Sequence, residues 1–384
     1  MYGYGGLTMD ALPALLNRSG FAVDVISTNK RIKKIRDAHQ LIVVNTLDDV
    51  IQAVMNKSEI GYDLYIPADD PTLRAIKNSN ISVKDKLKLL PIIEEKNIHH
   101  IYSKIGLAKV FHDAYICSPR FIIAYNKKQL QSSFYTLGFP LMVKIDSSSG
   151  GTGTYQCNNE FDLQILPEFQ YPVLIQEKIE GNEIDLSAFY QQGKLIHFSY
   201  SEILSQVNNK FGPSSLRRYK TRSSLNRGIT DVLSEIGLAL GANGFVNIGC
   251  IQKKSDKKLY FIESDMRPTV WVEYSKYFRD DPACYIKKYF ESGEFLTHDS
   301  FNIKMKNEEI ILPYLPRLDI FSIIINRYNC HNFYENYARR NILIDKVLYD
   351  PLLTWIHNAV KPKVPSKIWD FLKKTYQFIN KSFY

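Results

Sequence analysis

The sequence predicts a mixed α/β fold with several domains. Strands and helices alternate over residues 3–100, a serine- and glycine-rich turn follows an apolar strand near residue 145, and two strands around residue 255 form a hairpin. Strands that alternate with helices are typical of a parallel sheet, whereas a hairpin makes an antiparallel one. With 384 residues, the chain is long enough for two or three packed domains.

The composition is ordinary for a globular protein, with 45% hydrophobic and 23% charged residues. Five scattered cysteines without a C-x-x-C pair argue against a disulfide framework or a structural zinc site, and they fit a reducing cytoplasm. We find no leader pattern at the start and no run of 18 apolar residues, so we expect a cytoplasmic protein without a membrane span.

Residues 1–100 are expected to form an N-terminal domain with a parallel sheet of Rossmann type. The expected elements are helices over 7–18 and 50–55 and strands over 21–26, 41–44 and 63–66. The cluster Gly3–Gly6 is expected to be a tight turn rather than a nucleotide contact. His99 and His100 lack the spacing of a metal site and are expected to be a surface pair.

Residues 101–172 are expected to form a small second domain. Its expected elements are a helix over 104–112, a strand over 121–123, one helix over 126–137, and strands over 141–145 and 154–156. Lys144 lies inside an apolar strand and therefore needs an anionic partner. The segment Ser147–Gly153 is either an ordinary hairpin loop or a flap whose backbone N–H groups cover phosphate oxygens.

Residues 173–292 are expected to form an antiparallel sheet that carries the chemistry. The expected elements are strands over 173–176, 184–190, 195–200, 245–252 and 259–264, and a helix over 230–240. A basic segment over 208–227 is expected to be a loop that is either solvated or bound to an acidic substrate.

Glu263 and Asp265 are the most informative residues of this part. They lie two residues apart at the end of an apolar strand, so both side chains point to one face. Mg²⁺ accepts carboxylate oxygens and keeps other positions for water and phosphate, which makes these residues candidate metal ligands. Arg267 is a fork-shaped donor for a phosphate or carboxylate. The alternative is a strand end whose charges are simply solvated.

These motifs, in this order, resemble the ATP-grasp superfamily, and look closest to its carbamoyl-phosphate-synthase-like and carboxylate–amine ligase branches. The matching segments are Gly-Phe-Pro-Leu-Met-Val-Lys144 with the flap, Val-Leu-Ile-Gln-Glu177-Lys-Ile-Glu-Gly-Asn-Glu183, and Phe-Ile-Glu263-Ser-Asp265-Met-Arg267-Pro. The similarity covers residues 3–290. It implies a Rossmann-like domain (1–100), a small α+β lid domain (101–172) and an antiparallel-sheet large domain (173–292). Residues 293–384 exceed the family core and are expected to form a mainly helical basic extension.

The resemblance also implies a role for each matching position. ATP phosphates would be contacted by Lys104 and Lys144 and covered by Ser147, Ser148, Ser149, Gly150, Gly151, Thr152 and Gly153. Adenine would lie against Glu177, Lys178 and Ile179, and the ribose hydroxyls against Glu183. Glu263 and Asp265 would hold Mg²⁺, or Mn²⁺ in its place, while Arg267 and Lys144 would act on the transferred phosphate.

Two positions depart from the family pattern. Asp265 stands where the family usually has Asn, and Asp can still bind Mg²⁺. Gly249 stands where the preceding strand normally supplies another ligand, an Asp, Glu or Gln; Asn247 or water is expected to substitute.

The implied function is that of an ATP-dependent carboxylate–amine ligase, which forms an amide through an acyl phosphate. Small-molecule acid and amine substrates are expected, nucleic acid is not, and a homodimer stays open. The alternative is an ATP-binding homologue without ligase turnover, acting as a regulatory or membrane-peripheral protein.

The extension, residues 293–384, holds much of the basic excess, since residues 301–384 carry 13 lysines and arginines against 7 acidic residues. Residues 367–384 predict a basic amphipathic helix. Packing on the catalytic body is favoured over contact with an anionic membrane.

Overall fold

The computed structural model describes residues 1–4, 8–35, 37–57, 61–206, 211, 214–225, 228–294 and 309–313. They belong to two compact units, a larger one of Met1–Ile203 and Tyr219–Glu309 and a smaller one of Leu204–Arg218 and Ile310–Tyr384. The helix predicted over 367–384 and nearly all of the expected extension lie outside the described residues. Within the described part of the chain, no helix has the length and apolar character needed to cross a bilayer.

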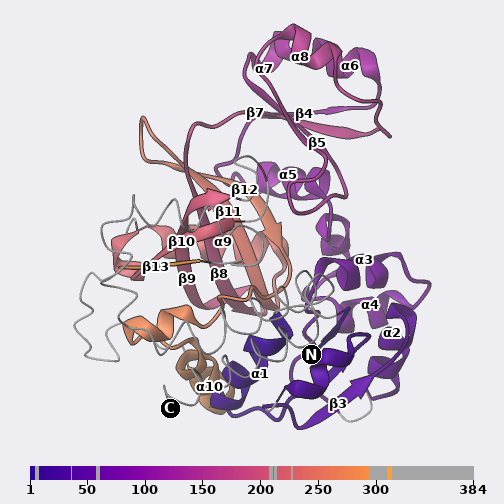
Figure 1. The fold of residues 1–384 in the computed structure, drawn as a ribbon, viewed down its shortest axis with the longest axis vertical. Helices are drawn as coiled ribbons and strands as arrows, with labels where there is room; N and C mark the ends of the chain where they lie inside the picture. The colour runs from indigo at the N-terminus through magenta and orange to yellow at the C-terminus, as the bar shows by residue number, and fades with distance from the viewer. Residues whose placement is uncertain are drawn as a thin grey trace, which may run out of the picture. The chain divides into compact units, whose positions relative to one another are not determined.

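The first hundred residues contain the predicted parallel sheet (Figure 1). Strands β1 (Tyr2–Gly3), β2 (Asp24–Ser27) and β3 (Gln40–Val43) pair in parallel in that order. The helices here are α1 (Thr8–Arg18), α2 (Leu47–Asn56), α3 (Asp70–Asn78) and α4 (Val83–Leu89), with 3₁₀ turns at Lys30–Lys34 and Glu95–His100. The prediction of a strand over 63–66 is wrong, because these residues form no strand and only the next residue, Pro67, makes an isolated bridge with Tyr2.

Side-chain caps define where helices α2 and α3 begin. Thr46 and Asp49 form a reciprocal capping box at the start of α2. The Asp69 carboxylate accepts a hydrogen bond from the backbone N–H of Thr72 at the start of α3. The cap of α3 fixes the position of Asp70, the first residue of that helix, which becomes important at the site below.

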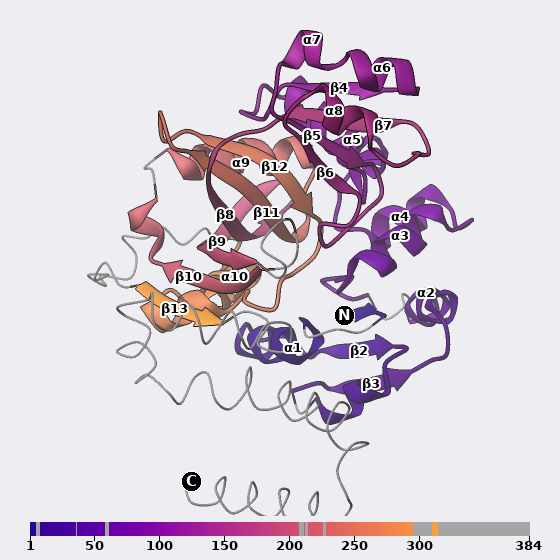
Figure 2. The same cartoon turned by 45° about the horizontal axis from the view of Figure 1, so that its top comes forward.

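The second part of the larger unit is a four-stranded antiparallel sheet with three short helices (Figure 2). The strands are β4 (Phe121–Ala124), β7 (Val173–Glu177), β5 (Leu141–Ile145) and β6 (Thr154–Cys157), in that spatial order. Helix α5 (Lys104–Asp113) precedes the sheet, and α8 (Glu160–Gln164) follows β6. The single helix predicted over 126–137 is two helices, α6 (Lys127–Ser132) and α7 (Phe134–Leu137), which break at Ser133.

The third part is a larger antiparallel sheet built from long strands. In the larger unit its order is β12 (Leu259–Asp265), β11 (Gly244–Lys253), β8 (Gly181–Gln191) and β9 (Lys194–Gln206). Helix α9 (Ile229–Leu240) supplies Leu233, Ile236 and Leu240 to the core that buries one face of this sheet. Its opposite face carries the polar residues described below.

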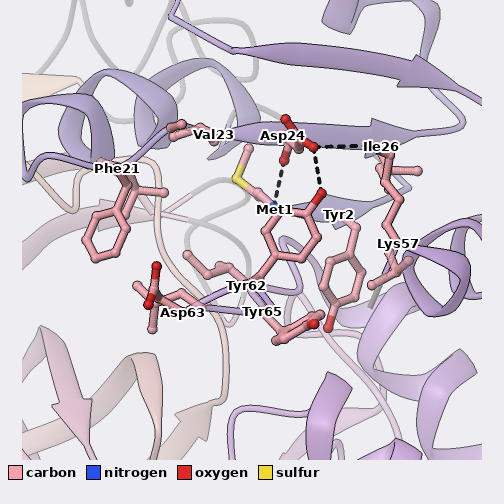
Figure 3. Close-up of a pocket in the computed structure, with 15 residues that line it drawn as sticks. Met1, Tyr2, Phe21, Val23, Asp24, Ile26, Lys57, Tyr62, Asp63 and Tyr65 are labelled. Carbon is pink, nitrogen blue, oxygen red and sulfur yellow. Dashed lines mark hydrogen bonds and ion pairs between the residues drawn. The ribbon is translucent and has the colours of Figure 1, made fainter. Parts of the chain in front are cut away.

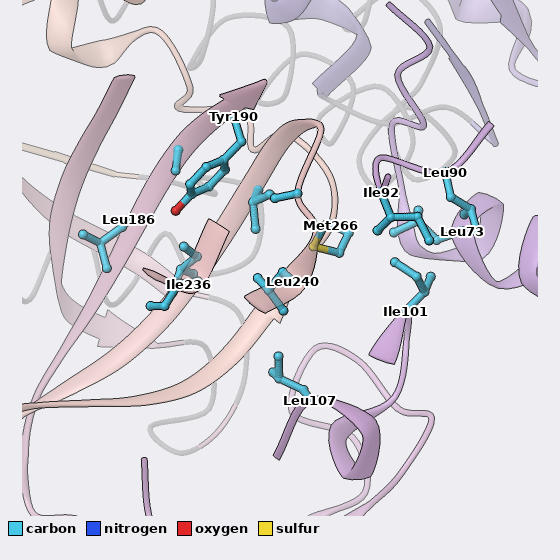
Figure 4. Packing of buried hydrophobic residues seen from close by; sticks show 14 of the residues in the cluster. Leu73, Leu90, Ile92, Ile101, Leu107, Leu186, Tyr190, Ile236, Leu240 and Met266 are labelled. Atoms are coloured by element: carbon cyan, nitrogen blue, oxygen red, sulfur yellow. The ribbon is translucent and has the colours of Figure 1, made fainter. Parts of the chain in front are cut away.

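One apolar cluster contains residues of the first hundred positions and of the large sheet (Figure 4). It contains Leu73, Leu90 and Ile92 from the first hundred residues, Ile101 and Leu107 from the chain at and before α5, and Leu186, Tyr190, Ile236, Leu240 and Met266 from the large sheet, its helix and the residue that follows β12. Because α3 and the end of β12 share this core, Asp70 and the residues that follow β12 are held near one another.

Two segments correct the sequence analysis. The basic segment 208–227, predicted as a loop, contains strand β10 (Ser214–Lys220) and a 3₁₀ turn at Arg222–Ser224. His100, predicted at the surface, is buried and 2% exposed. The remaining elements are a 3₁₀ turn at Tyr274–Phe278, α10 (Pro282–Ser292), and, in the smaller unit, β13 (Glu309–Pro313), which neighbours β10.

Candidate functional site

The two carboxylates singled out by the sequence lie on the edge strand of the large sheet. Glu263 is directly opposite Gly249, and Asp265 is directly opposite Asn247 on β11. Because Gly249 and Asn247 are two residues apart on their own strand, all four positions share one face of the sheet. The pairing therefore confirms that the Glu263 and Asp265 side chains point the same way.

Neighbouring protein groups raise the pKa of both carboxylates and so disfavour their charged forms. Burial is the main cause that raises the pKa of Glu263, while Lys104 and Lys144 act in the opposite direction. Burial likewise raises the pKa of Asp265, opposed mainly by Arg267 and reinforced by Asp70. The Glu263 side chain is nevertheless open to solvent and that of Asp265 is half-buried, so water limits these shifts. A cation at this place would relieve the repulsion.

Lys144 lies on β5 and brings a positive charge close to these acids. Burial lowers its pKa to about 8, whereas the nearby Glu263 and Glu183 raise it and Lys104 lowers it further. The sequence predicted that a lysine in this apolar strand needs an anionic partner, and the structure provides acidic neighbours for it. A bound phosphate would add a further anion beside Glu263 and Glu183.

The segment Ser147–Gly153 connects β5 to β6 and folds back toward the start of α5. Gly150, Gly151 and Gly153 adopt φ values of 60°, 78° and 70°, which favour glycine over residues with a Cβ. The Lys104 ammonium donates hydrogen bonds to the backbone carbonyl and the hydroxyl of Ser148. Lys104 therefore holds the flap in this structure, in the place where the sequence analysis expected a phosphate contact.

One recess brings the flap and the acidic residues together. A cavity of about 40 Å³ is lined by Lys104, Ser148, Ser149, Glu263 and Asp265, together with Asp70 and Asp146. Residues more than 100 positions apart in the chain thus face the same small space. This convergence is the geometric core of the candidate site.

Asp146 anchors the flap and was missed by sequence reasoning. Its carboxylate accepts hydrogen bonds from the Ser103 hydroxyl at 2.9 Å and from the Ile105 backbone N–H at 2.8 Å. It thereby ties the base of the flap to the N-terminus of α5. The signal in the sequence was an aspartate placed directly after the strand that carries Lys144.

The predicted adenine-contacting segment lies at the end of β7. The carboxylate of Glu177 accepts two hydrogen bonds from Arg120, from its backbone N–H at 3.0 Å and its Nε at 2.9 Å. The backbone N–H of Lys178 donates to Pro140, and Ile179 is buried. Glu183, the expected ribose ligand, lies on β8 and is close enough to Lys144 to affect its pKa.

Arg267 has two acidic partners. Its Nε and one Nη reach the two carboxylate oxygens of Asp70 at 2.5 and 3.0 Å, and the same Nη reaches Asp265 at 2.9 Å. The sequence predicted a phosphate or carboxylate partner for this fork-shaped group, and in this structure Asp70 supplies that carboxylate. Asp70 itself carried no signal beyond its place at a helix start.

The donor set suits a hard cation such as Mg²⁺. Asn247, 9% exposed, has a side-chain oxygen with no hydrogen-bond partner, and it lies across from Asp265 on the polar face. Carboxylate and amide oxygens are the ligands that Mg²⁺ takes. Within the described residues, no group of three or more His, Cys, Asp or Glu side chains is gathered closely enough to hold a metal alone. A metal here would therefore need water or phosphate to complete its coordination.

The basic segment 208–227 was predicted to be a loop that is either solvated or bound to a substrate. Two of its cations instead form ion pairs within the protein. Lys220 pairs with Glu202 at 2.7 Å. Arg222 is buried and donates to Asp280 at 2.6 Å and to the Tyr285 hydroxyl at 2.9 Å, and Asp280 also lies 3.3 Å from His197. The Lys220 pair links β10 to β9, and the Arg222 contacts reach Tyr285 of α10, so both cations have protein partners.

A separate cavity of about 60 Å³ lies beside the parallel sheet (Figure 3). Asp24 lines it and accepts hydrogen bonds from Tyr62 at 2.6 Å and from Lys57 at 3.2 Å. Because these polar groups satisfy one another, the cavity does not point to a ligand and lies apart from the flap and the acidic residues.

Comparisons with known proteins agree with this architecture. The N5-carboxyaminoimidazole synthetase from Staphylococcus aureus superposes with a TM-score of 0.60 at 16% identity, covering 86% of this chain and 85% of that one. The biotin carboxylase domain of Hydrogenobacter thermophilus 2-oxoglutarate carboxylase, solved with MgADP, gives 0.59 at 17% identity, covering 81% and 73%. An L-amino acid ligase from Bacillus licheniformis gives 0.55 at 13%, covering 81% and 78%.

Sequence comparison gives shorter matches. A stretch of 132 residues is 25% identical to the arginine-specific large chain of carbamoyl phosphate synthase from Bacillus subtilis (strain 168), covering 33% of this chain and 13% of that protein. A stretch of 211 residues is 25% identical to the large chain from Clostridium perfringens (strain 13 / Type A), covering 49% and 19%. The matches thus span less than a fifth of these relatives. No family model matches the sequence. The chain has the ATP-grasp fold, as the sequence predicted.

Proposed function

We propose that this protein is an ATP-dependent carboxylate–amine ligase that forms an amide through an acyl phosphate. The observation that carries the proposal is the recess shared by Lys104, the Ser148–Ser149 part of the flap, Glu263 and Asp265. A flap, a basic group and paired carboxylates around one space are the parts that phosphoryl transfer from a metal-bound nucleotide requires. The similar structures include complexes with ADP and MgADP, which supports a nucleotide in this place.

The proposed nucleotide contacts follow from where these groups lie. Lys144 approaches the phosphates from β5, and Lys104 exchanges its bond to Ser148 for a phosphate oxygen. The N–H groups of the flap cover the phosphates. Adenine contacts are assigned to Glu177, Lys178 and Ile179, and the ribose contact to Glu183. Domain divisions near residues 100, 172 and 292 are part of the same proposal.

Glu263 and Asp265 would hold Mg²⁺, or Mn²⁺ in its place, with Asn247 facing the same site. When bound, the metal would neutralise charge on the phosphate oxygens. The protein's own contribution is to keep these carboxylates ionised and oriented, for which the charges of Lys104, Lys144 and Arg267 all act in the required direction.

In the proposed reaction, a substrate carboxylate attacks the γ-phosphate, giving an acyl phosphate and ADP. An amine then displaces phosphate to form the amide and releases a proton. The chain holds both partners close together and supplies positive charge where negative charge grows, mainly through Lys144 and Arg267. Arg267 is suited to the acyl group because it already binds a carboxylate, that of Asp70.

The test is ADP release with panels of acids and amines, measured with purified full-length protein. Glu263→Gln should abolish turnover, whereas Glu235→Gln on the exposed side of α9 should leave it unchanged. Turnover that survives in Glu263→Gln would exclude the assigned metal role. Amide formation that matches ADP release one to one would support the ligase assignment over simple ATP hydrolysis.

A second candidate is a nucleotide-binding protein without ligase turnover. It is favoured by Gly249, which offers no ligand side chain, and by the pairing of Arg267 with Asp70. ADP binding with no ADP formed across the full panel would support this candidate. A cytoplasmic location and small-molecule partners belong to the first proposal.

A further inference from the structure

Gly249 has no side chain on the polar face of the sheet, and the space above it is approached by a carboxylate from a neighbouring strand. A Cβ placed on Gly249 would lie 3.3 Å from the Cβ of Glu263, 3.5 Å from an oxygen of Asp185 and 3.9 Å from an oxygen of Glu263. Carboxylate oxygens from β8 and β12 thus converge on the space above one residue of β11. The strand register explains this, because Gly249 is directly opposite Asp185 on one side and Glu263 on the other.

Asp185 is an unusual residue for its position. It is 9% exposed and lies in the middle strand pair of the sheet, where its neighbours across β9 and along β8 are the small side chains of Ser201 and Ser187. Its charge acts on both Glu263 and Asp265 and disfavours the ionised form of each. A third carboxylate beside these two adds to their repulsion, which a bound cation would relieve.

A second observation points to a ligand on the same face. The side-chain oxygen of Asn247 is buried without a hydrogen-bond partner, and Asn247 is two residues from Gly249 on β11. An acceptor left in this way is suited to a cation or to a water bound to one. The hydroxyl of Ser199, on β9 across β8 from Asn247, is also buried without a partner.

We propose that Asp185 supplies the metal ligand that Gly249 lacks, so that Asp185 and Glu263 together hold a divalent cation above Gly249. This inference rests on the proposed function, because the cation would complete its coordination with nucleotide phosphate and water. Two carboxylates with phosphate and water are a sufficient ligand set for Mg²⁺. The arrangement also explains why position 249 is glycine: a longer side chain would occupy the space that the Asp185 carboxylate uses.

The first experiment measures metal binding without turnover. Water-proton relaxation reports Mn²⁺·ADP when it becomes bound to the slowly tumbling protein. Asp185→Asn and Glu263→Gln should each weaken Mn²⁺·ADP binding at least about tenfold. Asp231→Asn, an exposed aspartate on α9, is the matched control and should bind like the wild type. ADP binding in EDTA, without metal, should be unchanged in Asp185→Asn. This measurement is the control for folding, because a general folding defect would weaken ADP binding with or without metal.

The outcomes separate the two proposals. If the wild type shows no bound Mn²⁺·ADP, the proposed function fails and this inference fails with it. If Glu263→Gln loses binding while Asp185→Asn keeps the wild-type affinity, the function stands and the role of Asp185 is overturned. If Asp185→Asn weakens ADP equally with and without metal, its role is structural and the inference is also overturned.

The second experiment moves the carboxylate side chain from position 185 to position 249. Gly249→Glu alone should crowd Asp185 and weaken Mn²⁺·ADP binding, because two carboxylates would compete for one space. Combining Gly249→Glu with Asp185→Ser moves the carboxylate ligand from β8 to β11. The double variant should bind Mn²⁺·ADP at least tenfold more tightly than Asp185→Ser alone. No recovery in a double variant that melts like the wild type would contradict the shared-space argument.

Discussion

Arg267, two residues beyond β12, binds Asp70 at the start of α3 through two hydrogen bonds of 2.5 and 3.0 Å. The two residues are 197 positions apart in the chain. The parallel fork of donors matches a carboxylate, and in the proposed reaction the same fork would face a substrate carboxylate or an acyl phosphate. A substrate group that used this fork would take the place of the Asp70 carboxylate.

Arg267→Lys should separate catalysis from stability when it is compared with Asp70→Asn. Lysine keeps the charge but loses the fork, so we expect kcat to fall about 100-fold. Asp70→Asn removes the partner but keeps Arg267, and it should lower the free energy of unfolding by about 1–2 kcal/mol with a much smaller change in kcat. Urea denaturation and steady-state kinetics measure the two effects. Equal losses of kcat in both variants would show that Arg267 acts only through Asp70.

Lys144→Gln should weaken nucleotide binding. Hydrogen bonds to charged groups contribute about 1.5–3 kcal/mol, so removal of the ammonium should raise the Kd for ADP about 10- to 100-fold. Lys109→Gln, an exposed lysine on α5, is the control and should bind ADP normally. Calorimetric titration with ADP measures both. Wild-type affinity in Lys144→Gln would remove this residue from the phosphate site.

His100 should make the protein less stable in acid. Burial lowers its pKa from 6.5 to about 4, its Nε2 donates to the Leu240 carbonyl at 3.0 Å, and its Nδ1 has no partner. The folded state therefore prefers the neutral ring, and between pH 6.5 and 4 only the unfolded state takes up the proton. Stability contributed by this residue is complete above pH 6.5 and should fall by about 3 kcal/mol as the pH approaches 4.

His100→Gln tests this prediction because glutamine can donate to Leu240 but does not titrate in this range. The pH dependence of its urea midpoint should be flatter than that of the wild type between pH 4 and 6.5. His112→Gln, which removes an exposed histidine, should keep the wild-type slope. Parallel pH profiles for His100→Gln and the wild type would contradict the assignment.

The buried ion pair of Arg222 and Asp280 should matter for folding and little for nucleotide binding. Asp280→Asn leaves the Arg222 charge buried without its counter-charge and should cost about 3–5 kcal/mol. Replacing both residues, Asp280→Asn with Arg222→Met, should cost less than the sum of the single changes, because no unpaired charge remains. Chemical denaturation of the three variants measures the coupling. Additive losses would show that the two residues do not act as a pair.

Local pattern was enough to predict most elements. Two apolar runs joined by a polar turn predicted β11 and β12, and helical spacing with a glycine stop predicted α9, whose C-cap Gly241 has a left-handed φ of 57°. The same reasoning failed for β10, because Arg217 and Lys220 made the segment look too polar for a strand. The charge of Lys220 is neutralised by Glu202 on the neighbouring strand, which no local pattern reveals.

The order of the motifs also predicted the candidate site in outline. Lys144, Glu263 and Asp265 were identified from residue type and position, whereas Lys104 was identified through the resemblance to the ATP-grasp superfamily. Asp70, Asp146 and Asp185 were missed, since a single aspartate at a helix start, after a strand or within one has many structural explanations. Their significance depends on what lies opposite them.

The amino-acid sequence by itself determined the periodicity of the strands and helices, the glycine-rich flap and the order of the charged motifs, because these depend on neighbours within a few positions. Tertiary structure alone decided that Asp185 fills the gap above Gly249 and that Asp70 binds Arg267. Both relationships arise from strand register and from a shared core, which join residues that are far apart in the chain.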